Sequence, residues 1–287
     1  MTHPTPALGD RPLKARPFRF DFSATPLQWL PSSPFASHLI SVLHLIAPVG
    51  ERRFVAVMQH ALSAVDDPRL RAEMRGFIGQ EAVHAHAHDA VLARMAQLGV
   101  KTAPFIARCE AAYDMAAGER RPGLVPAGLW LAWRLAYAAA AEQMTCLLGD
   151  WVLDARPLDA PGADPEMVSF LRWHGAEEIE HRAVTFEVLE RLAGPAAYPL
   201  RVMAMLTLFP TLLLLWHQGT RYLTDRDPAL AGRRFGFGDY MLAVKSGHAP
   251  GWEVLGAFGR FLWPGFHPVN EGRAAVAEAF MATAPAR

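Results

Sequence analysis

Four separate stretches of the chain carry carboxylate and imidazole side chains at spacings that suit a metal site. The first and third stretches each hold an isolated glutamate, and the second and fourth each hold a Glu-x-x-His pair. In chain order these candidates are Glu51, then Glu81 and His84, then Glu142, then Glu178 and His181. This is the ligand inventory of a carboxylate-bridged dinuclear metal site in a four-helix bundle, and it predicts redox chemistry.

A helix would place each Glu-x-x-His pair on one face, because residues three and four apart are neighbours on a helix surface. His174 lies four residues before Glu178 and seven before His181, so it is a third candidate histidine ligand. His88 lies on the stripe of the first pair, where a role behind the ligands and a packing role both remain open. Glu177 could reach His181 by its spacing, so the choice of Glu178 as the ligand depends on the repeated pattern. Glu177 is assigned, like His88, to a role behind the ligands.

The charge of these groups favours bound metal ions. Four glutamates would bring about four negative charges into one core, where crowded carboxylates repel each other and resist ionisation. Glu142 is the only acidic residue between Leu124 and Gly149. Glu51 and Glu142 suit bridging or terminal carboxylate ligands. Two divalent ions would cancel the charge, and mixed carboxylate and imidazole donors suit iron or manganese and also accept zinc.

Each signal is weak alone, because a Glu-x-x-His pair on a surface helix is usually a set of polar side chains facing water. Two such pairs, each preceded by an isolated glutamate, are much harder to obtain by chance. His86 lies off the ligand stripe and is expected to be exposed, and Cys146 is interpreted as a small buried hydrophobic residue. Ala138 and Ala139 either leave space for substrate or dioxygen beside Glu142 or allow close helix packing.

The candidates must be positioned by helices, and the sequence predicts an all-α, ferritin-like four-helix bundle with additional N- and C-terminal helices. The helix carrying Glu51 is expected to begin at Pro48 or Val49, because proline is tolerated in a first turn. No strand alternation of useful length is visible. Capping, glycine and proline signals place the expected helices at 35–47, 48–65, 68–97, 103–117, 126–154, 165–192 and 197–223.

The same signals predict one domain with three parts. Residues 1–34 form an irregular, proline-rich arm. Residues 35–223 form the helical bundle, and residues 224–287 form shorter helices that pack on it. The N-terminal stretch lacks the apolar core of a signal peptide.

The composition of the chain limits the function classes. Hydrophobic residues make up 52% of 287 residues, which allows a large core and excludes global disorder. Lys plus Arg equals Asp plus Glu at 28 each, so nothing indicates a nucleic-acid partner. The only two cysteines, Cys109 and Cys146, cannot make a disulfide framework or a thiolate zinc site, and they fit a reducing cytoplasm.

The most apolar run of the chain is 202–216, VMAMLTLFPTLLLLW, between Arg201 and His217. Its fifteen residues fall short of the roughly 20 that span a bilayer. We interpret it as a buried helix kinked near Pro210, in preference to a helix lying at a membrane interface.

Five stretches together carry a family resemblance: PVGERRFVAV, GFIGQEAVHAHAHDAV, AAAEQMTCLLGD, LRWHGAEEIEHRAVTFEV and FLWPGFHP. In this order, over about residues 17–270, they resemble the bacterial family of predicted metal-dependent hydrolases. The His-x-x-x-Glu-x-x-His pattern is also similar to that of the p-aminobenzoate N-oxygenases, ferritin-like di-iron enzymes with an extra histidine ligand. The resemblance implies metal ligation by Glu51, Glu81, His84, Glu142, His174, Glu178 and His181. Their arylamine substrate does not carry over, because the match is confined to the ligand motifs.

The leading functional hypothesis is a di-iron oxidoreductase that activates dioxygen to oxygenate or desaturate a hydrophobic organic substrate. An external electron donor would be needed, because no flavin or nicotinamide fingerprint is present. The alternative is a metal-dependent hydrolase, in which the same two metals activate a water molecule. The third hypothesis, iron storage or ferroxidase activity, fits less well, because the long apolar C-terminal half exceeds what such a subunit needs. A homodimer is the default assembly.

Overall fold

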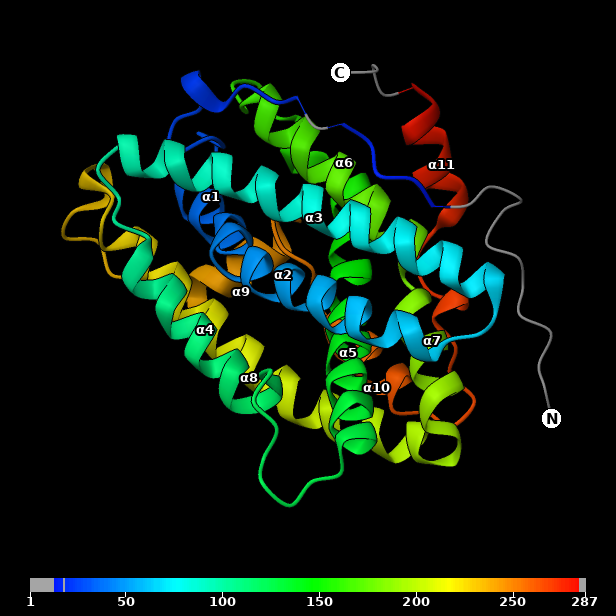
Figure 1. Cartoon of the computed structure of the whole chain (residues 1–287). Coiled ribbons are helices and arrows are strands. Elements are labelled where there is room, and N and C mark those ends of the chain that lie inside the picture. The colour runs from blue at the N-terminus through cyan, green and yellow to red at the C-terminus, as the bar shows by residue number, and fades with distance from the viewer. Residues whose placement is uncertain (1–12, 18, 284–287) are drawn as a thin grey trace.

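The computed structural model describes residues 13–17 and 19–283, which form an all-α protein with no β-strand in these ranges (Figure 1). The expectation of an all-α fold is therefore confirmed. The helices are α1 (Pro34–Ser41), α2 (Leu43–Ala61), α3 (Pro68–Gln97), α4 (Ala103–Ala117), α5 (Ala127–Asp154), α6 (Pro165–His181), α7 (Val184–Ala193), α8 (Ala197–Thr224), α9 (Phe237–Lys245), α10 (Glu253–Phe261) and α11 (Ala274–Thr283).

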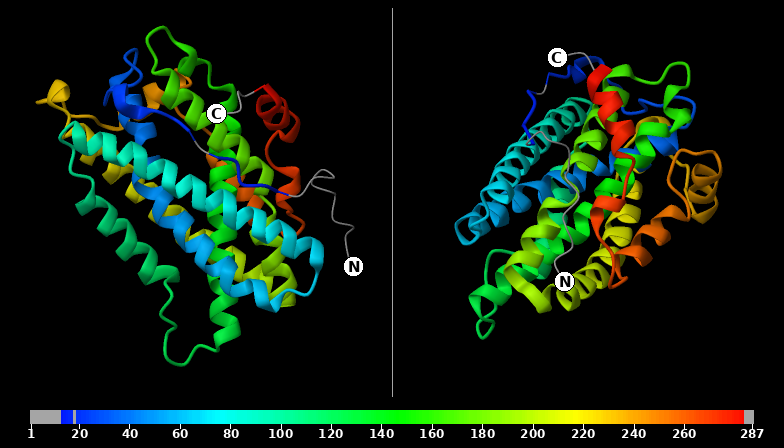
Figure 2. Two further views of the ribbon diagram at one scale, coloured as in Figure 1. Left: turned by 45° about the horizontal axis from the view of Figure 1, so that its top comes forward. Right: turned by 90° about the vertical axis from the view of Figure 1, so that its right-hand side faces the viewer.

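Four long helices carry the candidate ligands, and they contact one another. α2 packs along α3, α5 packs along α6, and the two pairs meet through α2 with α5 and α3 with α6. Figures 1 and 2 show α5 crossing the α2–α3 pair. α8 and α10 pack on α5, α4 packs on α2, and α11 packs on α6, so the additional helices surround these four.

Helix starts follow the capping signals in the sequence. Asp67 precedes α3, and its carboxylate accepts hydrogen bonds from the backbone N–H groups of Arg69 and Leu70 at 2.9 and 3.3 Å. Asp164 precedes α6 and accepts from the N–H of Met167 at 2.8 Å. These bonds pair N–H groups that have no partner within the helix, which fixes where two of the ligand-bearing helices begin.

The expected start of a helix at Pro48 is wrong, because α2 begins at Leu43 and runs through Pro48 without interruption. A proline there removes the hydrogen bond to the carbonyl of His44. Buried side chains on both sides, Leu45 and Val49, hold the helix together across this point. Packing therefore outweighs the local preference of proline.

The expected single helix 165–192 is also wrong, because α6 ends at His181 and α7 begins at Val184. No glycine or proline marks this break. Instead, the buried guanidinium of Arg182 donates hydrogen bonds at 3.0 and 2.9 Å to the carbonyls of Pro268 and Val269. The break depends on a contact with a segment more than eighty residues away, which local sequence patterns do not reveal.

The interpretation of 202–216 as a buried helix is wrong in part. α8 buries Met205 and Leu208 against the core, but Met203, Leu206 and Leu213 are about half exposed. The stretch Pro165–Thr224, which contains α8, includes a helix long and apolar enough to cross a membrane by length and composition, with 33% of the qualifying window buried. Pro210 lies inside α8. One face of this helix is thus apolar and uncovered by the described residues.

The N-terminal arm is irregular in its described part, as expected, apart from a short 3-10 helix at Phe22–Ala24. It lies along α3, as the first view of Figure 2 shows. Gly76 and Gly79 of α3 allow this approach, because a side chain at either position would collide with Leu13 or Ala15 of the arm. The arm therefore covers the outer side of the helix that carries the first Glu-x-x-His pair.

Candidate metal centre

The structure brings all seven predicted ligand side chains into one buried cluster at the junction of α2, α3, α5 and α6. None of them is more than 3% exposed. Glu51 comes from α2, the first Glu-x-x-His pair from α3, Glu142 from α5, and the remaining three from α6. His86 points to solvent, as the spacing predicted.

A pair of glycines sets the distance between α5 and α6. A side chain at Gly149 would collide with the backbone of Gly175, and one at Gly175 would lie 2.7 Å from the Cα of Gly149. The two backbones therefore touch at this point. Gly175 lies next to His174, so this close crossing holds the donor-bearing part of α6 against α5.

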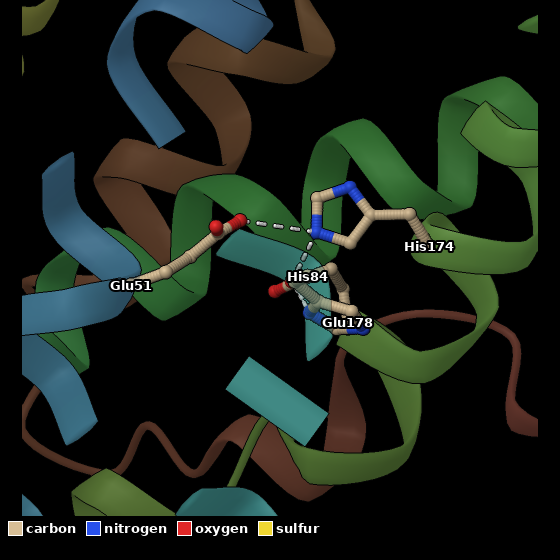
Figure 3. A group of neighbouring side chains, drawn as sticks. All are labelled: Glu51, His84, His174 and Glu178. Atoms are coloured by element: carbon tan, nitrogen blue, oxygen red, sulfur yellow. Dashed lines mark ion pairs between the residues drawn. The ribbon is translucent and has the colours of Figure 1, made fainter. Parts of the chain in front are cut away.

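The donors fall into two groups that share two residues. Glu51, His84, His174 and Glu178 form one group, and Glu81, His84, Glu178 and His181 form the other, with donor atoms within 4.8 Å of one another in each. Figure 3 shows the first group, with Glu51 approaching from the opposite side to His174 and Glu178. Two adjacent four-donor groups that share ligands are the arrangement a dinuclear site requires.

Glu178 occupies the middle of the cluster. Its Oε1 atom lies 2.9 Å from His174 Nε2, 3.3 Å from His84 Nδ1 and 3.8 Å from His181 Nε2. Sequence spacing suggested that Glu51 and Glu142 were bridging or terminal carboxylates, whereas the geometry makes Glu178 the carboxylate common to both groups. Glu142 lies beyond the second group, with Oε2 at 2.9 Å from His181 Nδ1.

The two ends of the cluster differ in composition. We call Glu51, His174 and His88 the nitrogen-rich end, because His88 Nε2 also lies 3.2 Å from Glu51 Oε1. We call Glu81, Glu142 and His181 the carboxylate-rich end; here Glu81 Oε1 lies 3.1 Å from His181 Nε2. His84 and Glu178 lie between the ends and belong to both.

Each predicted ligand has at least one buried nitrogen or oxygen with no hydrogen-bond partner among the described residues. These atoms are Glu51 Oε2, Glu81 Oε1 and Oε2, His84 Nδ1, Glu142 Oε1, His174 Nε2, Glu178 Oε2 and His181 Nε2. Leaving a buried polar atom unpaired costs about 1–3 kcal/mol, so eight atoms without a well-aligned hydrogen bond in one place favour a common partner. Metal ions would be such a partner, and the donor set fits them.

At the nitrogen-rich end the imidazoles favour an ionised carboxylate. Burial opposes ionisation of Glu51, but the neighbouring His88 and His174 outweigh it and lower the pKa of Glu51 to about 2. Burial and nearby His84 oppose protonation of His174, yet its contacts with Glu178 and Glu51 raise its pKa to about 9. Carboxylates and imidazoles thus partly balance each other here.

At the carboxylate-rich end the same balance fails. Burial, followed by the charge of Glu178, raises the pKa of Glu81 to about 8. The same two causes raise the pKa of Glu142 well above its usual range. Both carboxylates therefore resist ionisation, because the charged form lacks enough positive partners.

Glu177 lies behind the cluster, as the sequence suggested, but it serves His84 and not His181. His84 Nε2 donates to Glu177 Oε2 at 2.9 Å, which leaves His84 Nδ1 facing the centre. The other carboxylate oxygen of Glu177 accepts from Arg16 at 2.6 Å. Arg16 also binds Glu180 at 2.7 Å. Carboxylates in this position fix the orientation of a metal-binding imidazole.

Arg16 and His44 are functional candidates that sequence reasoning missed. Arg16 lies in the irregular arm, where no periodicity indicates its target. His44 Nδ1 pairs with His88 Nδ1 at 2.8 Å, and His44 is seven residues before Glu51 on α2. That spacing places both on one helix face. The signal was present, but the expected break at Pro48 assigned the two residues to different helices.

His88 carries a contact on each ring nitrogen and is completely buried. Burial lowers its pKa, even though Glu51 opposes the shift. Its Nε2 atom has no well-aligned hydrogen bond. His88 is therefore either a further donor at the nitrogen-rich end or the residue that orients Glu51.

Two apolar cavities reach the cluster. The larger, of about 390 Å³, touches His174 and Glu178. The smaller, of about 100 Å³, touches four of the glutamates, and its lining includes Ala141 and Thr145 of α5. Ala138 and Ala139 line neither cavity and lie in the hydrophobic core, which supports close packing as their role. Cys146 is likewise buried among apolar residues and is a free thiol.

Comparison with known proteins gives one match. Residues 14–272 match the family described as predicted metal-dependent hydrolase. No curated protein and no solved structure matches the chain.

Proposed function

The chain belongs to the family of predicted metal-dependent hydrolases, and on that premise we propose that it is an enzyme with a dinuclear metal centre acting on an apolar substrate. The observation that carries the proposal is the set of unpaired, buried donor atoms on all seven predicted ligands. They form two adjacent groups beside two apolar cavities.

We assign the metal positions from the two groups. One ion would be held by Glu51 and His174, and the other by Glu81 and His181, with His84 and Glu178 between them. Glu142 would complete the second position through its unpaired Oε1 atom, because it lines the smaller cavity together with Glu81 and Glu178; its other oxygen, Oε2, contacts His181 Nδ1. The ligand chemistry suits iron, manganese or zinc.

Metal ions in this site would supply Lewis-acid activation of water if they are zinc or manganese, and activation of dioxygen if they are iron. The surrounding residues would orient the donors in the same way for either reaction. Glu177 accepts a hydrogen bond from His84 Nε2, and Arg16 donates a hydrogen bond to Glu177. The apolar walls of the cavities exclude water from all but the reacting end of a substrate and strengthen the electrostatic interactions there.

Hydrolysis is the first candidate reaction, because the description of the family supports it. Oxidation with dioxygen, which the spacing of the ligands suggested, is the second candidate. Two features favour it: the centre collects three or four histidines among its carboxylates, and the larger cavity is lined mainly by hydrocarbon side chains. An oxygenase or desaturase would also need an external electron donor, because the substrate supplies only two of the four electrons that reduce dioxygen.

The two reactions can be separated by metal and by oxygen. Protein loaded with zinc or manganese is expected to cleave long-chain p-nitrophenyl esters without oxygen, at a rate that Glu178→Gln abolishes and the exposed Glu110→Gln leaves unchanged. If the iron-loaded protein instead consumes dioxygen only with an apolar substrate, and no metal supports cleavage, hydrolysis is excluded and oxidation takes its place. If neither activity appears in protein that binds two metals, the centre is not catalytic.

The cellular location remains part of the proposal. Both cysteines are free and buried, so the described residues contain no disulfide that would mark an oxidising compartment. A cytoplasmic protein is therefore what the chemistry of the chain supports.

A further inference from the structure

The larger cavity connects the candidate metal centre with the protein surface. Its volume of about 390 Å³ lies within the range of roughly 300–1,000 Å³ that small-molecule sites occupy. At its inner end are His174 and Glu178. At its outer end are residues of α8 and α9 and of the segment before α10, among them Leu213, Phe237 and Pro250.

Between these ends the lining is almost entirely hydrocarbon. α5 contributes Leu147, Leu148 and Trp151, and α8 contributes Phe209 and Leu212. A substrate group with several hydrogen-bonding atoms would leave them unpaired along this wall, which is costly. A chain of methylene groups has no hydrogen-bonding atoms to leave unpaired, and its burial is favoured by the hydrophobic effect.

The outer end of the cavity passes directly into an exposed apolar surface. Leu213 and Phe237 line the cavity and are also 49% and 79% exposed. On α8 the exposed residues Met203, Leu206 and Leu213 fall on one helical stripe. On α9 the exposed residues Phe237 and Met241 do the same, and Trp252 before α10 is 80% exposed.

We propose that the larger cavity binds the aliphatic chain of a lipid-class substrate, and that the exposed stripes of α8 and α9, together with Trp252, rest on the lipid surface from which the chain enters. The inner end of the chain would then lie beside His174 and Glu178. This inference rests on the proposed function only for the reaction that takes place there.

A lipid surface fits this face better than a second copy of the chain. A protein partner seated on the stripes would cover Leu213 and Phe237 and so close the mouth of the cavity. Each stripe also continues into an exposed basic residue, Arg221 four residues after the cavity-lining His217 on α8 and Lys245 four residues after Met241 on α9. Apolar side chains beside basic ones are typical of helices that lie on membranes with anionic headgroups.

The proposed site for the aliphatic chain is tested with zinc-loaded wild-type protein and the fluorescent polyene fatty acid cis-parinaric acid. Saturable binding is expected, at one molecule per chain. The variant Leu148→Trp fills the cavity from α5 and should weaken binding at least about tenfold, because the added ring occupies space the chain needs. Its metal content should remain that of the wild type, which shows that the centre is intact.

The docking surface is tested by flotation with vesicles of phosphatidylcholine and phosphatidylglycerol. The double variant Leu213→Glu/Phe237→Glu should lose at least about tenfold in vesicle binding, because charged side chains replace apolar ones at the membrane interface. Leu124→Glu is the matched control, since Leu124 is fully exposed and lies far along the chain from the stripes, before α5. It should float like the wild type.

Three results would overturn the proposal: no saturable binding of cis-parinaric acid, equal binding by Leu148→Trp, or equal flotation by the double variant. A wild type that forms dimers, ignores vesicles and becomes monomeric in the double variant would identify the face as a protein interface instead. Metal analysis of the same samples separates these failures from a failure of the proposed centre. A wild-type protein that binds the fatty acid and the vesicles but does not hold two metal ions would refute the proposed function and leave the lipid site standing.

Discussion

The nitrogen-rich and carboxylate-rich ends of the candidate centre are built from the same repeated motif and yet differ in chemistry. Each end takes one isolated glutamate, and the two ends share one member of each Glu-x-x-His pair, His84 and Glu178. The pKa of Glu51 at one end is lowered to about 2, whereas that of Glu81 at the other is raised to about 8. The repeat therefore creates two groups of candidate donors, and the residues around it make the two groups unequal.

The asymmetry comes from the additional histidines. In α3 the extra histidine, His88, follows the pair by four residues, and in α6 the extra histidine, His174, precedes it by four. The contacts between α3 and α6 are antiparallel, because Glu81 contacts His181 and His84 contacts Glu178. Both additional histidines therefore lie at the same end of the cluster, with ring centres 4.9 Å apart. At the opposite end the equivalent positions hold Phe77 and Thr185, which offer no imidazole.

The largest expected effect comes from a residue common to both ends. Glu178→Gln should remove both metals, because its Oε1 atom faces all three histidines and belongs to both donor groups. The loss of affinity should exceed the roughly 10–100-fold that residues behind the ligands cost. Metal analysis after dialysis measures it. The matched control is Glu180→Gln, two residues later, which should keep two metals; equal losses in both variants would refute the assignment.

Variants at a single end should remove a single metal. Glu51→Gln should empty the nitrogen-rich position and Glu142→Gln the carboxylate-rich one, each leaving about one ion per chain, because each glutamate lies at one end only. Titration with Fe(II) or Zn(II) followed by metal analysis gives the stoichiometry. If either change removes both ions, the two positions are not independent and the comparison between the ends fails.

The sequence predicts the helical class, most helix boundaries and the seven donors, because these depend on capping residues and on the helical period. It does not predict the break after His181, which Arg182 and the distant carbonyl of Pro268 stabilise. It also misses Arg16, whose position depends on how the arm lies across Gly76 and Gly79. Local sequence signals thus locate the donors within a helix. The residues that orient those donors are positioned by contacts between remote segments, which local signals do not reveal.

Metal affinity should depend on pH more strongly than the usual pKa values of carboxylates would suggest. At pH 7 Glu81, with its pKa near 8, and His174, with its pKa near 9, hold protons in the metal-free protein. Both must lose them to bind metal, so affinity should rise as pH increases from 6 to 9, by about tenfold per unit for each proton released.

Calorimetric titration at pH 7 in two buffers with different ionisation enthalpies counts these protons. Release of one or more protons per metal is expected. An affinity that stays constant between pH 6 and pH 9 would mean that the carboxylate-rich end is already ionised, and the contrast between the two ends would disappear.

The smallest expected effect lies outside the cluster. Arg16→Ala removes the cation that holds Glu177 against His84, and it should lower metal affinity about tenfold without changing the stoichiometry. Arg19→Ala, also in the arm, is the control. A full loss of metal in Arg16→Ala would show that the centre does not form without the arm. An unchanged affinity would show that Glu177 orients His84 without help from Arg16.

The most direct test of the account is anomalous diffraction from crystals of the metal-loaded protein, recorded at the absorption edge of the metal. Two peaks are expected between α2, α3, α5 and α6, one beside Glu51 and His174 and one beside Glu81 and His181, with Glu178 contacting both. A single peak, or none at this junction, would contradict a dinuclear centre.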